Sequence, residues 1–355
     1  MNNLDQQYLD LLRDIREHGV KKIGRNGTTY SVFGRTIRHK MAEGFPLLTT
    51  KKMHWPGIVH ELLWFLNGDT QLQTLLKNNV GIWTGDAYKR FERAYGMNEL
   101  FEDLRIFLPP ADCINEDGSL IDIKQFAEKI KHDKDFAEDW GNLGPIYGYQ
   151  WRNFGATDDL HPNGVDQIAD LVKTLKTNPD DRRMMVSAWN PTDIGAMILP
   201  PCHYAFQVYT RELSFEEQLQ WVMWNTDVEM ENLAITERAM DQTTPKRAIS
   251  LMWNQRSVDV GLGWPFNVAS YGLLLSMLGH HVNMIPDELI CSLGDTHIYE
   301  NQMEGLEKQL ERTPFALPTL KICDRKVKNL WDYCFEDFEI LNYQSHPHIK
   351  LPLSN

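Results

Sequence analysis

The sequence predicts a single α+β domain over residues 1–355, in which a mixed β-sheet packs against helices. Two kinds of segment occur along the chain and support this class. Runs with strand character lie at 184–189, 204–209, 219–224 and 248–253. Apolar residues at helical spacing predict helices at 5–18, 58–66, 166–177 and 267–282. No internal repeat or heptad array is present, so one domain with two insertions accounts for the pattern.

The first elements follow from local signals. Leu9, Leu12 and Ile15 share one face of the opening helix, and Gly19 ends it. Residues 24–29 then form a glycine-flanked turn. The helix at 58–66 is apolar nearly all round, which predicts that it is buried although it carries one carboxylate.

The later elements have clear ends. Ile168, Leu171 and Leu175 lie on one face of a helix that stops at Asn178-Pro179. The helix at 267–282 is strongly apolar and should lie in the core. Two stretches depart from this density. Residues of about 86–140 are charged and irregular, and those of about 212–246 contain a polar excursion from a β-hairpin, so we interpret both as insertions.

Composition excludes several classes of function. The 49 acidic residues outnumber the 36 basic residues and give a net charge of −13, which argues against a general nucleic-acid surface. No apolar run reaches the roughly 20 residues of a membrane span, and no signal peptide is evident. The five cysteines form no Cys-x-x-Cys pair, so we expect neither disulfides nor a metal site. These features predict a cytoplasmic protein, in the host cytoplasm if a phage encodes it.

Cys202 is the strongest candidate for a nucleophile. It follows two prolines that stiffen the chain and precedes His203, a setting that can expose a thiol at a strand end. Nearby cations would stabilise the thiolate. The alternative, an ordinary buried cysteine, is the interpretation that we give to the other four, Cys113, Cys291, Cys323 and Cys334.

Arginines and one hydroxyl form a candidate phosphate site. Arg25 lies in the early turn, Arg182 and Arg183 precede a strand, and Arg256 neighbours Ser257. Guanidinium groups bind phosphate through paired hydrogen bonds. Each arginine alone could equally be a solvated surface residue.

Four further polar residues have a functional and a structural interpretation. Glu61 is either paired in the core or a catalytic carboxylate with a raised pKa. Asn267 is either the N-cap of the helix after it or an amide that reads a pyrimidine edge. His297 and Tyr299, at alternating strand positions, are either structural or in contact with a sugar hydroxyl.

Taken together, these segments resemble the thymidylate synthase family, within the superfamily that alkylates carbon 5 of pyrimidine nucleotides. The resemblance covers most of the chain outside residues 86–140 and 212–246. It implies the thymidylate synthase-like fold. The matching motifs are Phe45-Pro46-Leu47-Leu48-Thr49-Thr50-Lys51-Lys52, His60-Glu61-Leu62-Leu63-Trp64-Phe65-Leu66, Gly144-Pro145-Ile146-Tyr147-Gly148, Asp181-Arg182-Arg183, Pro201-Cys202-His203, Gln255-Arg256-Ser257, Gly263-Trp264-Pro265-Phe266-Asn267 and Gly294-Asp295-Thr296-His297-Ile298-Tyr299.

The resemblance implies reductive methylation of dUMP to dTMP with 5,10-methylenetetrahydrofolate. Cys202 would add to carbon 6 of the uracil, while Glu61, Tyr147 and His203 would serve proton transfer. The residues implied in nucleotide binding are Arg25, Arg182, Arg183, Gln255, Arg256, Ser257, Asn267, His297 and Tyr299. Those implied in folate binding are Trp83, Asp259, Leu262, Gly263 and Phe266. In the family the arginine pair serves the partner subunit's site, so Arg182 and Arg183 imply a homodimer.

Three departures from the family lie on the folate side: Asp86, Trp264 and the polar C-terminus from Leu351 to Asn355. Asp86 and the C-terminus favour a dUMP hydroxymethylase, in which water replaces hydride. Trp83 favours methylation. A cytosine-nucleotide hydroxymethylase would prefer aspartate to Asn267, and a binding protein without catalysis would not need Cys202.

Overall fold

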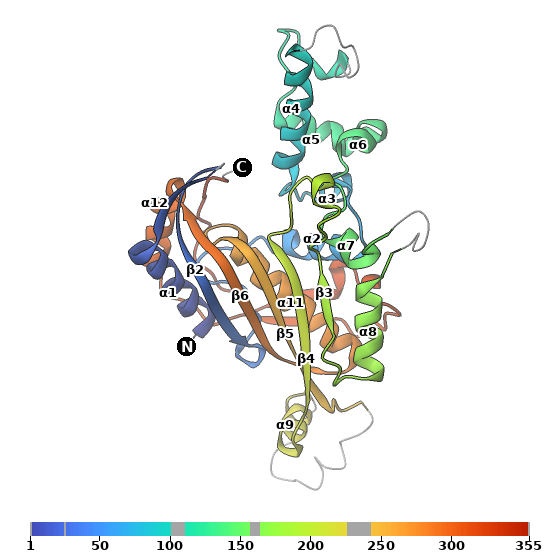
Figure 1. Cartoon of the computed structure of the whole chain (residues 1–355). Coiled ribbons are helices and arrows are strands. Elements are labelled where there is room, and N and C mark those ends of the chain that lie inside the picture. Colours follow the sequence, from blue (N-terminus) through green and yellow to red (C-terminus); the bar gives the residue numbers. More distant parts are fainter. Residues whose placement is uncertain (1, 25, 101–110, 157–163, 226–242, 354–355) are drawn as a thin grey trace. The chain divides into compact units, whose positions relative to one another are not determined.

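The computed structural model describes every residue except 1, 25, 101–110, 157–163, 226–242 and 354–355 (Figure 1). The chain forms two compact units. The first contains Met1–Ile58, Asp166–Ser187 and Cys202–Ser354, and the second contains Val59–Val165 and Ala188–Pro201. The single-domain organisation therefore stays a prediction.

The first unit is built on a six-stranded mixed sheet with strand order β1-β2-β6-β5-β4-β3 (Figure 1). All neighbouring pairs are antiparallel except β5 and β6, which are parallel. A separate antiparallel pair joins β7 to β8. The strands are β1 (Val20–Gly24), β2 (Gly27–Lys40), β3 (Met185–Ser187), β4 (His203–Glu212), β5 (Arg247–Asp259), β6 (Ile285–Tyr299), β7 (Thr319–Ile322) and β8 (Phe338–Leu341).

Helices cover this sheet and connect its strands. The α-helices of the first unit are α1 (Asn3–His18), α8 (Gln167–Thr177), α9 (Phe215–Asn225), α11 (Gly263–Val282) and α12 (Met303–Leu310). Its short 3₁₀ helices are η1 (Met41–Glu43), η4 (Glu300–Gln302), η5 (Leu330–Asp332) and η6 (Phe335–Asp337). Helix α11 is buried along most of its length and is the crossover between the parallel strands. It packs on the sheet through Tyr271, whose ring stacks on Trp253 of β5 at 4.9 Å.

The second unit is helical within its described residues. Helix α2 (Trp55–Leu66) passes from the first unit into it. Its other elements are α3 (Leu72–Lys77), α4 (Thr84–Leu100), η2 (Ala111–Cys113), α5 (Ile123–His132), α6 (Lys134–Trp140), α7 (Gly148–Asn153) and η3 (Ile194–Ala196).

Most predicted elements are confirmed, with different ends. The opening helix, the turn between β1 and β2, the buried helix that became α2, and strands β3, β4 and β5 all lie where the sequence places them. Arg25, within that turn, lies outside the described residues. None of the described helices is both long and apolar enough to cross a membrane.

Two local predictions were wrong. Residues 219–224 belong to helix α9, because Ser214 and Glu217 cap its start: the Ser214 N–H donates to Glu217 Oε2 at 2.8 Å, and the Glu217 N–H donates to Ser214 Oγ at 3.2 Å. The stretch from 86 to 140 is not irregular where it is described. Phe91 of α4, Phe126 of α5 and Phe136 of α6 pack against one another and form a buried aromatic core.

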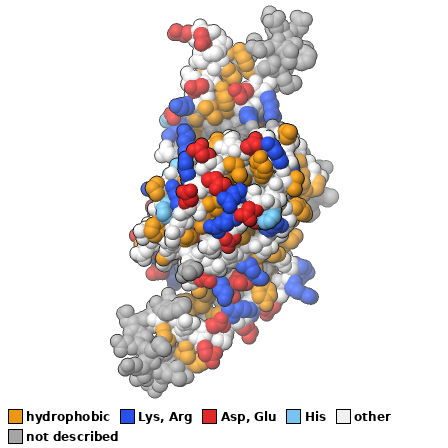
Figure 2. Space-filling model, turned by 90° about the vertical axis from the view of Figure 1, so that its left-hand side faces the viewer, with side chains coloured by type: hydrophobic (Ala, Val, Ile, Leu, Met, Phe, Trp, Pro, Cys, Tyr) orange, Lys and Arg blue, Asp and Glu red, His pale blue; other side chains and the backbone are white. Residues whose placement is uncertain are grey.

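Surface charge is mixed on the side of the first unit that carries α1 and α12. Basic and acidic side chains lie intermingled there (Figure 2). Arg16 of α1 pairs with Glu307 of α12 at 3.0 Å, and Lys21 of β1 pairs with Glu300 at 2.7 Å. Among the described residues, this side presents no continuous basic surface of the kind that collects nucleic-acid phosphates.

Candidate active site

Cys202 lies immediately before β4, as the sequence predicts. Cys202 is half-buried. By contrast, Cys113 and Cys291 are buried, and Cys323 and Cys334 are exposed. The Cys202 carbonyl accepts a hydrogen bond from the Arg256 N–H at 2.8 Å, which ties the start of β4 to β5. Burial thus agrees with a structural role for Cys113 and Cys291, but Cys323 and Cys334 are not the buried cysteines that we expected.

His203 is buried beside Tyr271 of α11. Its Nδ1 lies 2.9 Å from the Tyr271 hydroxyl, and the two rings meet edge to face. Burial lowers the pKa of His203 to about 3, so the imidazole is neutral near pH 7. His203 therefore does not supply the positive charge that the sequence suggested for a thiolate at Cys202.

Asn267 lies within α11, not at its start, so the interpretation as an N-cap is wrong. The Asn267 side chain is oriented by Gln255, which lies opposite His203 in the sheet register. The Gln255 Nε2 donates to Asn267 Oδ1 at 3.0 Å, while Gln255 Oε1 accepts from the Trp253 indole at 3.2 Å. This network leaves the Asn267 Nδ2 as the group that can donate to a ligand.

The predicted folate residues of the first unit gather where β5 leads into α11. Leu262, Gly263 and Phe266 are half-buried, whereas Trp264 and Pro265 between them are fully covered. This pattern gives the start of α11 one partly accessible, largely apolar face.

Asp259 ends β5 beside this face. Its Oδ1 accepts from the Leu262 N–H at 3.0 Å, and its Oδ2 accepts from Gln302 Nε2 at 3.1 Å. Gln302 is fully buried and also donates to the Pro352 carbonyl at 3.1 Å. Gln302 therefore connects Asp259 to the C-terminal segment.

Trp264 does not bear on the folate side, contrary to the sequence-based expectation. Its ring is fully buried and stacks on Tyr8 of α1 at 5.2 Å, with the two planes 9° apart. Its indole N–H donates to Cys291 Sγ at 3.4 Å. The core of the first unit accommodates this larger residue.

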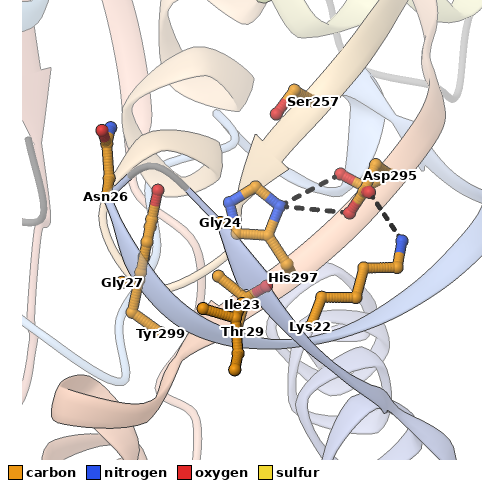
Figure 3. A pocket seen from close by; sticks show the side chains of 10 residues that line it. All are labelled: Lys22, Ile23, Gly24, Asn26, Gly27, Thr29, Ser257, Asp295, His297 and Tyr299. Atoms are coloured by element: carbon orange, nitrogen blue, oxygen red, sulfur yellow. Dashed lines mark hydrogen bonds and ion pairs between the residues drawn. The ribbon is translucent and has the colours of Figure 1, made fainter.

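Three predicted nucleotide-binding residues line one pocket of about 340 Å³ (Figure 3). Ser257 comes from β5, and His297 and Tyr299 come from β6. Asp295 lies two residues before His297 on the same strand, and its Oδ1 is 3.4 Å from His297 Nδ1. The Asp295 Oδ2 accepts a hydrogen bond from Lys22 Nζ at 2.9 Å. The pocket thus offers hydroxyl, imidazole and carboxylate groups on two adjacent parallel strands.

None of the three predicted arginines that the structure describes lines this pocket. Arg256 is exposed, and Arg182 and Arg183 are exposed in the turn before β3. The Arg183 guanidinium pairs with Asp181 at 2.7 Å, which lowers the pKa of that carboxyl to about 2. Neither Arg182 nor Arg183 lines the pocket of Figure 3.

The second unit brings together Glu61, Trp83 and Tyr147. The Trp83 indole N–H donates to Glu61 Oε1 at 2.8 Å. The Trp83 ring meets Tyr147 edge to face at 5.9 Å, and Phe65 stacks on Tyr147 at 4.9 Å. Burial raises the pKa of Glu61 to about 7, against the opposing effect of the Trp83 hydrogen bond.

Tyr147 has an unusual backbone conformation, with φ of 24°. Such strain persists only where the surroundings enforce it, and it is common at functional sites. The next residue, Gly148, has no space for a side chain, because a Cβ would lie 2.4 Å from the Phe65 carbonyl oxygen. The predicted role of Tyr147 in the site thus coincides with a locally constrained backbone.

Sequence reasoning missed three residues of the first unit that contact its candidate site residues. Tyr271 positions His203, Gln302 positions Asp259, and Asp295 contacts His297. Asp295 could have been found, because it shares a strand face with His297 and Tyr299. Tyr271 and Gln302 act through contacts distant in sequence and carry no local signal. No metal-binding group of His, Cys, Asp or Glu side chains occurs in the described parts of the chain.

Comparison with known proteins shows which family the chain is similar to. Residues 6–355 match the family model described as "Thymidylate synthase". The chain is 40% identical over 346 residues to a "Thymidylate synthase" of Mycoplasma mobile, with 97% of this chain and 98% of that protein covered. It is 37% identical, with the same coverage, to a "Thymidylate synthase" of Mycoplasma pneumoniae.

The raised pKa of Glu61 predicts a specific dependence of stability on pH. Between about pH 4.5 and 7 the unfolded chain ionises Glu61 while the folded chain keeps it protonated, so wild type loses stability as pH rises. Glu61→Gln removes this loss. We expect the variant's advantage in unfolding free energy to grow by about 3 kcal/mol across this window and then stay level. Urea denaturation at several pH values measures it.

Glu304→Gln is the matched control for this experiment. Glu304 is exposed, and its hydrogen bond with Lys308 lowers the pKa of its carboxyl, so its pH effect has the opposite sign. A difference between wild type and Glu61→Gln that stays constant from pH 4.5 to 7 would show that Glu61 ionises normally.

Proposed function

This chain belongs to the thymidylate synthase family, and from that membership we propose that it catalyses the reductive methylation of dUMP to dTMP with 5,10-methylenetetrahydrofolate. The observation that carries the proposal is Cys202: a half-buried thiol that immediately precedes β4, in the unit that also contains the pocket of Figure 3. A thiol in that setting is suited to covalent catalysis.

In the proposed reaction Cys202 adds as a thiolate to carbon 6 of the uracil, which makes carbon 5 nucleophilic. Once carbon 5 has bonded to the one-carbon unit it loses its proton, and the bond from Cys202 to carbon 6 then breaks, which restores the ring double bond and releases the thiolate. The folate supplies the one-carbon unit and the hydride. Glu61, with a pKa near neutrality, is suited to exchange protons with the nucleotide through water, together with Tyr147. His203 is neutral and buried, so we assign it to positioning at the start of β4.

The nucleotide is proposed to bind the first unit. Ser257 and the exposed Arg256 would contact the phosphate, with Arg25 also assigned to it by resemblance. His297 and Tyr299 would contact the ribose hydroxyl. The uracil edge would meet the Asn267 amide that Gln255 orients.

The folate ring is proposed to bind the first unit at the start of α11. Leu262, Gly263 and Phe266 offer a partly accessible apolar face for a flat ring, and Asp259 offers a fixed carboxylate for N–H donors. Trp83 of the second unit is assigned to the same ligand by resemblance.

A homodimer completes the proposal. Two large apolar side chains are exposed on one side of the sheet of the first unit, where Gln207 also lies: Met185 is 57% exposed and Tyr209 is 66% exposed. Such a surface is typical of a protein interface. Arg182 and Arg183, exposed beside this face, would reach the partner subunit's site.

Product analysis tests the reaction. With dUMP and methylenetetrahydrofolate we expect dTMP and dihydrofolate in equal amounts by mass spectrometry. Cys202→Ser should bind dUMP but form no product, because a hydroxyl is far less ionised than a thiol near pH 7. If the wild type forms 5-hydroxymethyl-dUMP and tetrahydrofolate, the protein is a hydroxymethylase instead.

Asn267→Asp tests the assignment of the base-reading residue. Gln255 would still donate to one carboxylate oxygen, and the other would replace Nδ2 as an acceptor for the cytosine amino group. We expect the ratio of kcat/KM for dCMP to that for dUMP to rise at least about tenfold. Asn254→Asp, the same change on β5, is the control and should leave the ratio unchanged. An equal response of both variants would remove Asn267 from base recognition.

Subunit mixing tests the proposed arginine in trans. In a heterodimer of Cys202→Ser and Arg182→Ala subunits, one site receives both lesions and the other receives neither, so about half of the sites should be active. Mixing Cys202→Ser with Glu61→Gln is the control: both residues are assigned to one chain's site, so every site keeps one lesion. A Cys202→Ser and Arg182→Ala mixture that stays inactive after verified exchange contradicts the shared site.

A further inference from the structure

A second cavity of about 340 Å³ lies in the first unit, between α8, the end of α11 and the segment at 328–331. It shares no lining residue with the pocket of Figure 3. Its polar wall is basic: Lys173 and Lys176 come from α8, His281 from α11 and Lys328 from the segment before η5. No acidic residue lines it.

The basic wall is unusual in a chain with a net charge of −13. Among the described residues, none of the three lysines forms an ion pair with a carboxylate, whereas Lys21, Lys22 and Lys308 elsewhere each do. Lys173 and Lys176 are three residues apart on one helix, where like charges repel. An anionic ligand would relieve this repulsion.

The contact between Lys176 and His281 points the same way. Lys176 Nζ lies 3.0 Å from His281 Nε2. This nitrogen can accept a hydrogen bond from the lysine only when the imidazole is neutral. Burial lowers the pKa of His281, and Lys176 and His280 lower it further, while Asp332 raises it. A bound anion would favour the protonated ring, because it could accept from the Nε2–H that then faces Lys176.

Helix dipoles explain only part of the cluster. Lys176 and His281 lie in the last turns of α8 and α11, where positive charge is favourable without any ligand. Lys173 lies before the last turn of α8, and Lys328 belongs to neither helix. The positions of these two lysines, which are both exposed, are therefore not explained by a helix end.

The other wall of the cavity is apolar. Val172, Leu330 and Trp331 contribute to the lining. The volume lies at the lower end of the range for small-molecule sites, about 300–1,000 Å³, and suits a ligand with a single ring. We propose that this cavity binds a small aromatic phosphate monoester, with the phosphate among Lys173, Lys176, Lys328 and His281 and the ring against Val172 and Trp331.

Phenyl phosphate is the probe for the test. Protein labelled with ¹³C in the histidine rings is titrated by NMR in the presence of saturating dUMP, which occupies the proposed nucleotide site. We expect the His281 signal, assigned with His281→Gln, to shift saturably and the pKa of His281 to rise. Lys173→Gln/Lys328→Gln should weaken binding about tenfold.

Lys308→Gln/Lys321→Gln is the matched control, because it removes the same charge from lysines outside the cavity. It should leave the affinity unchanged. The proposal is overturned if His281 does not respond, or if the control pair weakens binding as much. Inorganic phosphate that binds as tightly as phenyl phosphate would overturn the role of the apolar wall, and a free phosphate site would remain. dUMP that shifts His281 beyond saturation of its own site would identify a nucleotide as the occupant.

Discussion

The parallel pairing of β5 with β6 is the constraint on which the site depends. Parallel neighbours need a long crossover, and α11 supplies it in a sheet that is otherwise antiparallel. The register then sets Ser257 opposite Asp295 and Asp259 opposite His297. Because α11 begins a few residues after β5 ends, Asn267 returns towards Gln255 of that strand. One connection thus fixes three groups of candidate site residues.

Burial determines the charge states in both units. His203 is kept neutral by a lowered pKa, and the pKa of Glu61 is raised to about 7, although the two groups carry opposite charges when ionised. The common cause is the cost of removing a charge from water. Each group retains one polar partner, Tyr271 for His203 and Trp83 for Glu61, so that it is not left unsatisfied. Of these two groups, only the Glu61 carboxyl has a pKa near 7.

Local patterns predicted most elements, and the two errors had readable signals. Ser214 to Glu217 is a Ser-x-x-Glu capping box, and Asp122 to Gln125 caps α5 in the same way, so both helices could have been predicted from caps rather than from apolar runs. The partners Tyr271 and Gln302 could not. Their roles depend on which strands pair, and pairing over long sequence separation leaves no periodic trace. Sequence motifs could identify candidate site residues, but they could not predict the protonation states of those residues.

The aromatic frame of the second unit explains why Glu61 lies in an apolar helix. Phe65, one turn further along α2, stacks on Tyr147, and Trp83 contacts both Tyr147 and the Glu61 carboxyl. The close approach of Gly148 to Phe65 fixes the backbone on which Tyr147 sits. A polar helix would hydrate the carboxyl and return its pKa to the ordinary range. The apolar run that first looked incompatible with a carboxylate is therefore what gives that carboxylate a pKa near neutrality.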